Sequence, residues 1–102
     1  MIYCFDLDGT LCEQRHLDYD KAQPYKDRVE IVNGLYEEGH HIIIDTARGS
    51  KYKKDWHDIT KNQLDSWGLK YHELRTSVKF SADIYVDDKA KNAYDFFKRN
   101  DY

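Results

Sequence analysis

The sequence predicts a single α/β domain with a mostly parallel sheet. Apolar runs with the length of strands alternate with segments that repeat apolar residues at helical spacing, and glycines follow two of those segments. This alternation is typical of strands that are joined by right-handed helical crossovers, which set parallel strands side by side in one sheet. The 102 residues are enough for one core of modest size. We therefore expect one domain over residues 1–102.

The first half of the chain supplies two predicted strands and one predicted helix. Ile2 to Phe5 form a short apolar run, and residues 13–23 form a polar loop that could act as a small flap. Pro24 suits the first position of a helix, and the apolar spacing extends that helix over residues 25–38. The β-branched run from His41 to Asp45 predicts a second buried strand.

The second half supplies a helix, two strands and a last helix. Asp55 is a candidate N-cap for a helix that Gly68 ends. Residues 71–74 predict a third strand and residues 83–86 a fourth, and a loop joins these two strands. Residues 89–99 carry apolar side chains at helical spacing, so we expect the last helix there.

Polar and charged residues follow three of the predicted strands at the points where each strand ends. They are Asp6, Asp8, Thr46, Arg48, Asp87 and Asp88, and Lys79 enters from the loop before the fourth strand. Because the carboxyl ends of parallel strands meet at one edge of a sheet, we expect these side chains to converge there. Carboxylates that are partly buried at such an edge require a cation or a proton nearby.

The two carboxylates that flank Leu7 indicate phosphoryl transfer. Alternate residues of a strand share a face, so Asp6 and Asp8 can point into the same cleft. Asp6 is the candidate nucleophile, which would form an aspartyl-phosphate, and Asp8 is the candidate general acid and base. Mg²⁺ would relieve the repulsion between a carboxylate and an anionic phosphate, with Asp6, Asp87 and Asp88 as candidate ligands.

Three further residues are candidates for binding the phosphate. The hydroxyl of Thr46 could hydrogen-bond a phosphoryl oxygen, and Lys79 would stabilise the charge that develops in the transition state. Arg48 could bind the substrate phosphate or simply close its own loop. Gly9 would let the backbone turn sharply beneath the phosphate.

The run Asp6-Leu7-Asp8-Gly9-Thr10 resembles the first signature motif of the haloacid dehalogenase (HAD) superfamily. Thr46, Lys79 and the pair Asp87-Asp88 resemble its second, third and fourth motifs, in the same order along the chain. The resemblance covers essentially the whole chain. It implies a three-layer, Rossmann-like fold, Mg²⁺ as cofactor and phosphatase chemistry.

The same resemblance assigns the metal ligands more closely. It implies that Asp8 offers its backbone carbonyl to the metal, that Asp88 is the direct carboxylate ligand and that Asp87 assists it. Residues 46–49, 67–68 and 87–90 are similar to small capless members from polysaccharide-biosynthesis loci and phage genomes. Neither the loop after the first motif nor the segment before Lys79 has room for a folded cap domain, so we expect an open, capless site.

Three classes of function fit these residues. The first is a Mg²⁺-dependent phosphomonoesterase for a small phosphorylated metabolite, such as a sugar phosphate or a nucleotide. The second is a phosphatase for the phosphorylated end of a nucleic acid, which only the basic loop of residues 48–54 favours. The third is a non-catalytic phospho-acceptor or HAD-like binding module. An inactive scaffold would be expected to lose Asp6 or Asp8, and both are present.

Composition limits the setting of this chemistry. A net charge of −3 gives no general case for binding nucleic acid or a membrane, and the longest aliphatic run, residues 42–44, cannot span a bilayer. Cys4 and Cys12 do not make a disulfide framework, so a reduced, cytoplasmic chain is the simpler interpretation. The expected partner is a small phosphorylated substrate, and a second copy of the chain could cover the open site.

Overall fold

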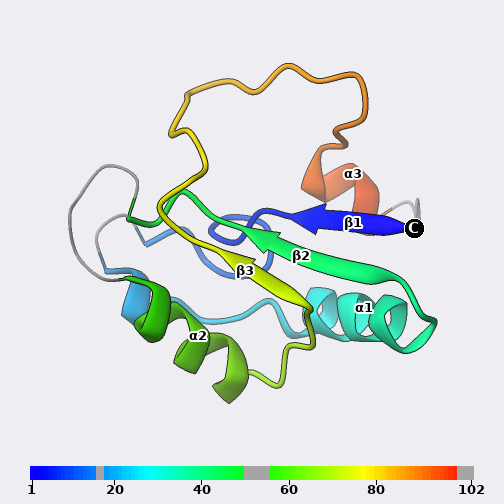
Figure 1. Cartoon of the computed structure of the whole chain (residues 1–102), viewed down its shortest axis with the longest axis horizontal. Coiled ribbons are helices and arrows are strands. Elements are labelled where there is room, and N and C mark those ends of the chain that lie inside the picture. Colours follow the sequence, from blue (N-terminus) through cyan, green and yellow to red (C-terminus); the bar gives the residue numbers. More distant parts are fainter. Residues whose placement is uncertain (16–17, 50–55, 99–102) are drawn as a thin grey trace.

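The computed structural model describes residues 1–15, 18–49 and 56–98, which form a small α/β domain around a parallel sheet (Figure 1). The sheet has three strands in the order β1-β2-β3. β1 spans Ile2–Phe5, β2 spans His41–Asp45 and β3 spans Glu73–Arg75. The first two strands have the predicted bounds, and the third begins two residues later than predicted. Both strand pairs are parallel, as expected.

The helices also follow the predicted order. α1 spans Lys26–Glu37 and α2 spans Trp56–Ser66, and a short 3-10 helix, η1, occupies Tyr19–Lys21 in the predicted loop. The last helix, α3, is shorter than predicted and spans Ala93–Lys98. The predicted N-cap of α2, Asp55, lies outside the described residues. None of the helices in the described part of the chain has the length and apolarity that crossing a membrane requires.

The core lies on one face of the sheet. Phe5, Ile42 and Ile44 alternate with exposed or half-buried residues along β1 and β2, so each strand buries a single face. All three α-helices add residues to the same buried cluster, and Phe96 of α3 packs against the Phe5 ring at 5.8 Å. On the opposite face Ile2 and Cys4 are exposed.

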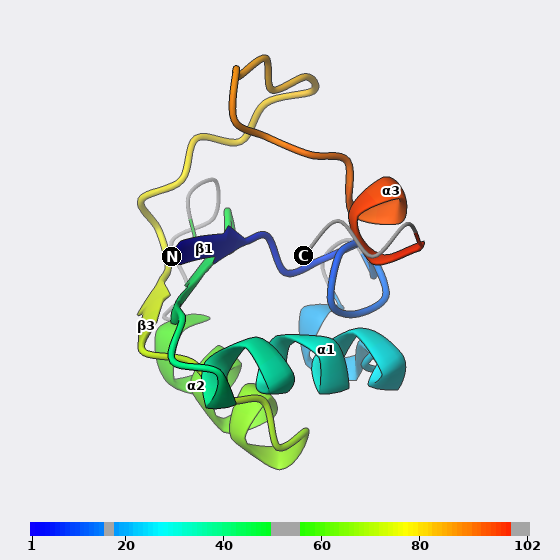
Figure 2. The ribbon, with the colours of Figure 1, turned by 90° about the vertical axis from the view of Figure 1, so that its right-hand side faces the viewer.

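This burial pattern corrects the expectation of three layers. In the described residues the helices contribute to one core on one face of the sheet, and Figure 2 shows them on the same side of the strands. The described part of the domain therefore has two layers, a sheet and a layer of helices. Parallel sheets normally have both faces covered, because βαβ crossovers place helices on each side.

The predicted fourth strand is wrong. Residues 80–92, which we call the outer segment, have no strand, and each of them is exposed. Ile84, Tyr85 and Val86 are 78%, 52% and 94% exposed, and Figure 1 shows the segment arching away from the sheet between β3 and α3. Their β-branched and aromatic side chains favour strand backbone, but a strand also needs a neighbour with which to exchange hydrogen bonds.

Candidate active site

The turn that follows β1 fixes the positions of the two carboxylates. The backbone N–H groups of Thr10 and Leu11 donate to the carbonyl of Leu7 at 3.0 and 2.8 Å, and Gly9 has a φ of +81°. Leu7 and Leu11 are fully buried and anchor this turn in the core. Asp6 and Asp8 therefore stand on either side of a buried leucine, at the carboxyl end of the sheet. We call this edge the carboxyl rim.

Asp6 combines an accessible carboxylate with a nearby cation. Its side chain is 40% exposed, and Oδ1 accepts a hydrogen bond from Nζ of Lys79 at 3.0 Å. The hydroxyl of Thr10 donates to the second oxygen, Oδ2, at 3.3 Å. The structure thus brings Asp6 and Lys79 together, as the sequence predicted, although 73 residues separate them.

Asp8 lies in a different environment, against the buried guanidinium of Arg48. Nε of Arg48 donates to Oδ2 of Asp8 at 2.9 Å, and Nη2 donates to Oδ1 at 2.7 Å. The side chain of Arg48 is fully buried and that of Asp8 is 10% exposed. Two parallel N–H···O bonds of this kind fix both the position and the plane of the carboxylate.

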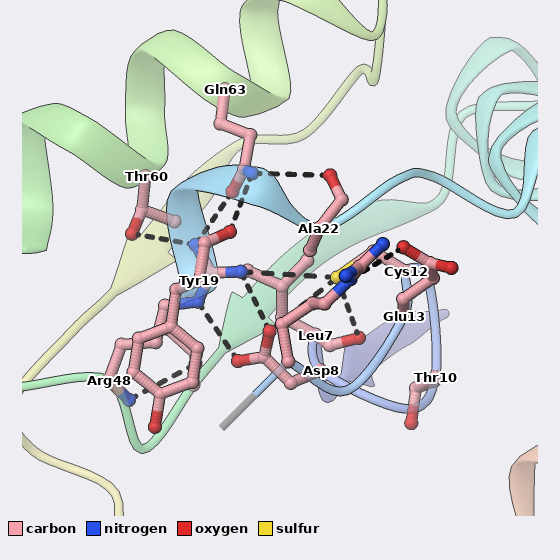
Figure 3. Close-up of polar contacts among 12 residues, drawn as sticks. Leu7, Asp8, Thr10, Cys12, Glu13, Tyr19, Ala22, Arg48, Thr60 and Gln63 are labelled. Atoms are coloured by element: carbon pink, nitrogen blue, oxygen red, sulfur yellow. Dashed lines mark hydrogen bonds and ion pairs between the residues drawn. The ribbon is translucent and has the colours of Figure 1, made fainter. Parts of the chain in front are cut away.

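Helix α2 and η1 complete the surroundings of Arg48 (Figure 3). Nη1 donates to the hydroxyl of Thr60 at 3.2 Å and to Oε1 of Gln63 at 2.7 Å, and both residues belong to α2. The ring of Tyr19, in η1, lies 4.8 Å from the guanidinium carbon. These contacts differ from both roles considered for Arg48, binding the substrate phosphate and closing its own loop, because the guanidinium joins Asp8 to α2. The guanidinium does not face open solvent where a substrate phosphate would bind.

Thr46 also makes a contact that orders the loop after β2, a hydrogen bond with the backbone of Arg48. It is buried, and its hydroxyl oxygen accepts a hydrogen bond from the backbone N–H of Arg48 at 3.2 Å. A hydroxyl can accept and donate at the same time, so this contact does not use the hydroxyl proton of Thr46, but the residue is only 1% exposed. The structure places Thr46 immediately after β2, in the loop predicted for it.

The loops after β2 and β3 cross, and this crossing delivers Lys79 to the carboxyl rim. Ser77 donates its backbone N–H to the carbonyl of Arg48 at 2.9 Å, and Thr46 donates to the carbonyl of Arg75 at 3.0 Å. Gly49 has a φ of +85°, and a Cβ at this position would collide with the hydroxyl of Ser77. The close approach therefore depends on a glycine. Beyond the crossing, the Nζ of Lys79 lies 4.9 Å from the ring centre of Tyr85.

The structure does not bring Asp87 and Asp88 to the carboxyl rim. Both are exposed in the outer segment, where Oδ1 of Asp87 accepts the backbone N–H of Lys89 at 2.8 Å. This hydrogen bond holds the pKa of the Asp87 carboxyl below its ordinary value. In the described part of the chain, no three His, Cys, Asp or Glu side chains are placed to hold a metal. The described arrangement therefore does not fit the predicted Mg²⁺ site, because the strand that would carry two of its ligands is absent.

Sequence reasoning missed four residues of the site. They surround Asp8 and Arg48, and they are Cys12, Tyr19, Thr60 and Gln63. The one signal in the sequence was Thr60, a polar residue on the apolar face of α2, which is fully buried in the structure. Burial and the neighbouring Asp8 carboxylate raise the pKa of the Cys12 thiol to about 12. Cys12 therefore remains a neutral thiol beside the ion pair.

The fold of this chain is similar to those of several solved protein structures. A crystal structure of an MCSG target from Vibrio cholerae superposes with a TM-score of 0.82 and 26% identity, covering 94% of this chain and 86% of that one. A chain of the Pnkp1/Rnl/Hen1 complex superposes with a TM-score of 0.60 and 19% identity. A chain from a second structure, of the Pnkp1/Rnl/Hen1 RNA repair complex, gives 0.58 and 18%. No family model and no curated protein matches the chain.

The three matches differ in what they cover. This chain spans most of the Vibrio cholerae protein, but only 30% and 29% of the two chains from the Pnkp1 complexes, of which it matches one part. At 19% and 18% identity the latter two show a shared fold alone. The comparisons are consistent with a Rossmann-like α/β domain.

Proposed function

We propose that this chain is a phosphatase with a HAD-like fold that hydrolyses a phosphomonoester through Asp6. One observation carries the proposal. Asp6 is an accessible carboxylate with a lysine at 3.0 Å, and on the other side of Leu7 a second carboxylate, Asp8, is held in place by a buried arginine. A nucleophile, a cation and a positioned acid–base group are the parts that this reaction requires.

In the first step an oxygen of Asp6 attacks phosphorus, and the bond to the leaving oxygen breaks. Asp8 enters this step protonated and gives its proton to the leaving oxygen, so the products are an aspartyl-phosphate and a free alcohol, and Asp8 regains the proton in the second step. In the second step Asp8 takes a proton from water, whose oxygen attacks the phosphorus and releases phosphate from Asp6. Each oxygen of a carboxylate has two acceptor sites, so Asp8 can bind Arg48 and still exchange this proton.

Lys79 and Thr46 would act on the phosphoryl group itself. Lys79 already lies against Asp6 and can offset the charge that the phosphate brings to the nucleophile. Mg²⁺ would supply further charge neutralisation, and a Mg²⁺ requirement remains a prediction from the sequence. Of the four predicted metal ligands, Asp6 through its carboxylate and Asp8 through its backbone carbonyl lie at the carboxyl rim in the described arrangement.

We propose a small phosphorylated metabolite as the substrate. The phosphorylated end of a nucleic acid is the second candidate. The fold of this chain is shared with part of two chains from Pnkp1/Rnl/Hen1 complexes, and one of these complexes is named for RNA repair. The structure describes only one of the four basic residues of the loop that first favoured this candidate. Arg48 is engaged by Asp8, and Lys51, Lys53 and Lys54 lie outside the described residues.

The decisive experiment measures release of phosphate from an aryl phosphate by the wild type and by Asp6→Asn. We expect the rate of phosphate release to be lower in the variant by about a thousandfold or more, because the amide cannot form the covalent intermediate. Asp83→Asn, at an exposed position of the outer segment, is the matched control and should keep full activity. Equal rates for the wild type and Asp6→Asn would exclude Asp6 as the nucleophile.

Two additions to this assay address the cofactor and the substrate. Activity should disappear with a chelator and return with Mg²⁺, and activity that a chelator leaves unchanged would exclude the predicted cofactor. A screen over sugar phosphates, nucleotides and 3′- or 5′-phosphorylated oligonucleotides separates the two substrate classes. A preference for the oligonucleotides would favour the second candidate. Phosphate binding with no release from any compound would favour a binding module.

A further inference from the structure

Gln63, in α2, joins two segments that both precede α2 in the sequence, the loop after β2 and η1. Its Oε1 accepts from Nη1 of Arg48 at 2.7 Å, and its Nε2 donates to the carbonyls of Tyr19 and Ala22 at 2.8 and 3.5 Å (Figure 3). A guanidinium can only donate, and a carbonyl can only accept, so these partners fix which end of the amide faces which. A single side chain therefore binds Arg48 and η1 together.

The neighbours of Gln63 reinforce the same connection. Thr60, one turn earlier on α2, accepts a second hydrogen bond from Nη1 of Arg48. The ring of Tyr19 covers the guanidinium and also packs edge-on against the ring of Trp56 at 5.1 Å. Helix α2 thus contributes two acceptors for Arg48 and an aromatic contact for η1.

We propose that Gln63 is a positioning residue that orients Asp8 through Arg48 and fastens η1 over the guanidinium. The guanidinium is planar, so an acceptor at Nη1 sets the plane in which Nε and Nη2 reach Asp8. Without Oε1, the longer bond to Thr60 is the one that Nη1 retains among the described residues, and the guanidinium loses a constraint on its rotation. This inference rests on the proposed function, in which Asp8 exchanges the proton.

Two substitutions at position 63 separate the two contacts. Gln63→Met removes both polar ends at similar length, whereas Gln63→Glu keeps an acceptor for Arg48 and removes the donor to η1. We expect Gln63→Met to lower kcat by about tenfold, the effect of one lost hydrogen bond to a charged group, with KM unchanged. Gln63→Glu should keep kcat within about threefold of the wild type, because the acceptor is retained. Asn62→Ala, at the adjacent exposed position of α2, is the control.

The contact between Gln63 and η1 can be tested by a measurement that does not depend on enzyme activity. In both variants Tyr19 loses its hydrogen bond to α2, so its ring should shield Trp56 less. Trp56 is 6% exposed in the structure, and we expect acrylamide to quench tryptophan fluorescence more strongly in both variants than in Asn62→Ala. Quenching equal to that of the control would overturn the fastening of η1.

The kinetic outcomes distinguish this inference from the proposed function. An active wild type with Gln63→Met at the wild-type kcat would overturn the role of Gln63 alone. A fall in kcat that Gln63→Glu does not restore, or a rise in KM of the same size, would also overturn it, because either indicates a general disturbance of the fold. A wild type without phosphatase activity, equal to Asp6→Asn, would overturn the proposed function and this inference with it.

Discussion

The surroundings of Arg48 and the outer segment satisfy their polar groups in opposite ways. Arg48 is fully buried, and its donors reach acceptors that come from the loop after β1 and from α2. The outer segment is exposed throughout, and the hydrogen bond from Lys89 to Asp87 spans only two residues. Polar groups in the first region depend on distant parts of the chain, and those in the second depend on their neighbours. Substitutions should therefore have large effects in one region and small effects in the other.

The largest effect is expected from Arg48→Met. The substitution leaves Asp8 with 10% of its side chain exposed and no cation, and it removes the donors to Thr60 and Gln63. Removing one partner of a buried ion pair costs about 3–5 kcal/mol, so the free energy of unfolding measured in urea should fall by about that amount. The control is Arg15→Met, which removes a 48% exposed arginine whose Nε lies 3.1 Å from Oε1 of the exposed Glu13 side chain. It should cost below about 1 kcal/mol, and equal losses in the two variants would contradict the comparison.

The next effect concerns the reactivity of Cys12. Burial and Asp8 raise the pKa of its thiol from 9.0 to about 12. At pH 9 only about one Cys12 thiol in a thousand should be ionised, against about half of ordinary thiols, so alkylation by iodoacetamide should be at least about a hundredfold slower than in urea. The measurement uses Cys4→Ser, so that Cys12 is the remaining cysteine.

The same pKa predicts how stability changes with pH. Because the pKa is higher in the folded chain, the folded state binds the proton more tightly than the unfolded state. The contribution to stability is therefore fully present below about pH 9 and is lost as the pH rises towards about 12. Rapid alkylation of Cys12 by iodoacetamide in the folded Cys4→Ser protein at pH 9 would contradict the expected slow reaction, because it would show that the region around Cys12 opens readily.

The smallest effect is expected from Val86→Asp in the outer segment. Val86 is 94% exposed, so a charge there should change the free energy of unfolding by less than about 0.5 kcal/mol. Val32→Asp is the control, because Val32 is fully buried in α1 and a charge there should unfold the protein. A loss of several kcal/mol in Val86→Asp would mean that the outer segment packs against the domain in solution, and the comparison would fail.

The sequence was sufficient for the parts of the fold that local pattern determines. The apolar runs at Ile2–Phe5 and His41–Asp45 are the two strands, and both pair in parallel as expected. Asp6 and Asp8 follow β1 directly, and Thr46 and Arg48 lie just beyond β2. Their placement needed only the bounds of the strands.

The remaining parts depend on contacts that a linear pattern does not carry. Residues 83–86 have the composition of a strand, but no pattern shows whether an edge is available to pair with them. The partner of Arg48 was equally hidden, because Asp8, Thr60 and Gln63 lie 12 to 40 residues away from it. The sequence therefore predicted which residues reach the carboxyl rim from β1 and β2, but not which of them bind one another.

The crossing of the loops after β2 and β3 has a consequence for how the sequence can vary. At Gly49 the left-handed backbone strains any other residue, and a Cβ there would also force the hydroxyl of Ser77 to move. At Gly34, within α1, a Cβ would meet nothing within 4 Å. In a library of all single substitutions, position 34 is therefore permissive, and alanine there suits the helix better than glycine. Position 49 favours glycine, since any other residue strains the left-handed backbone and requires the hydroxyl of Ser77 to move.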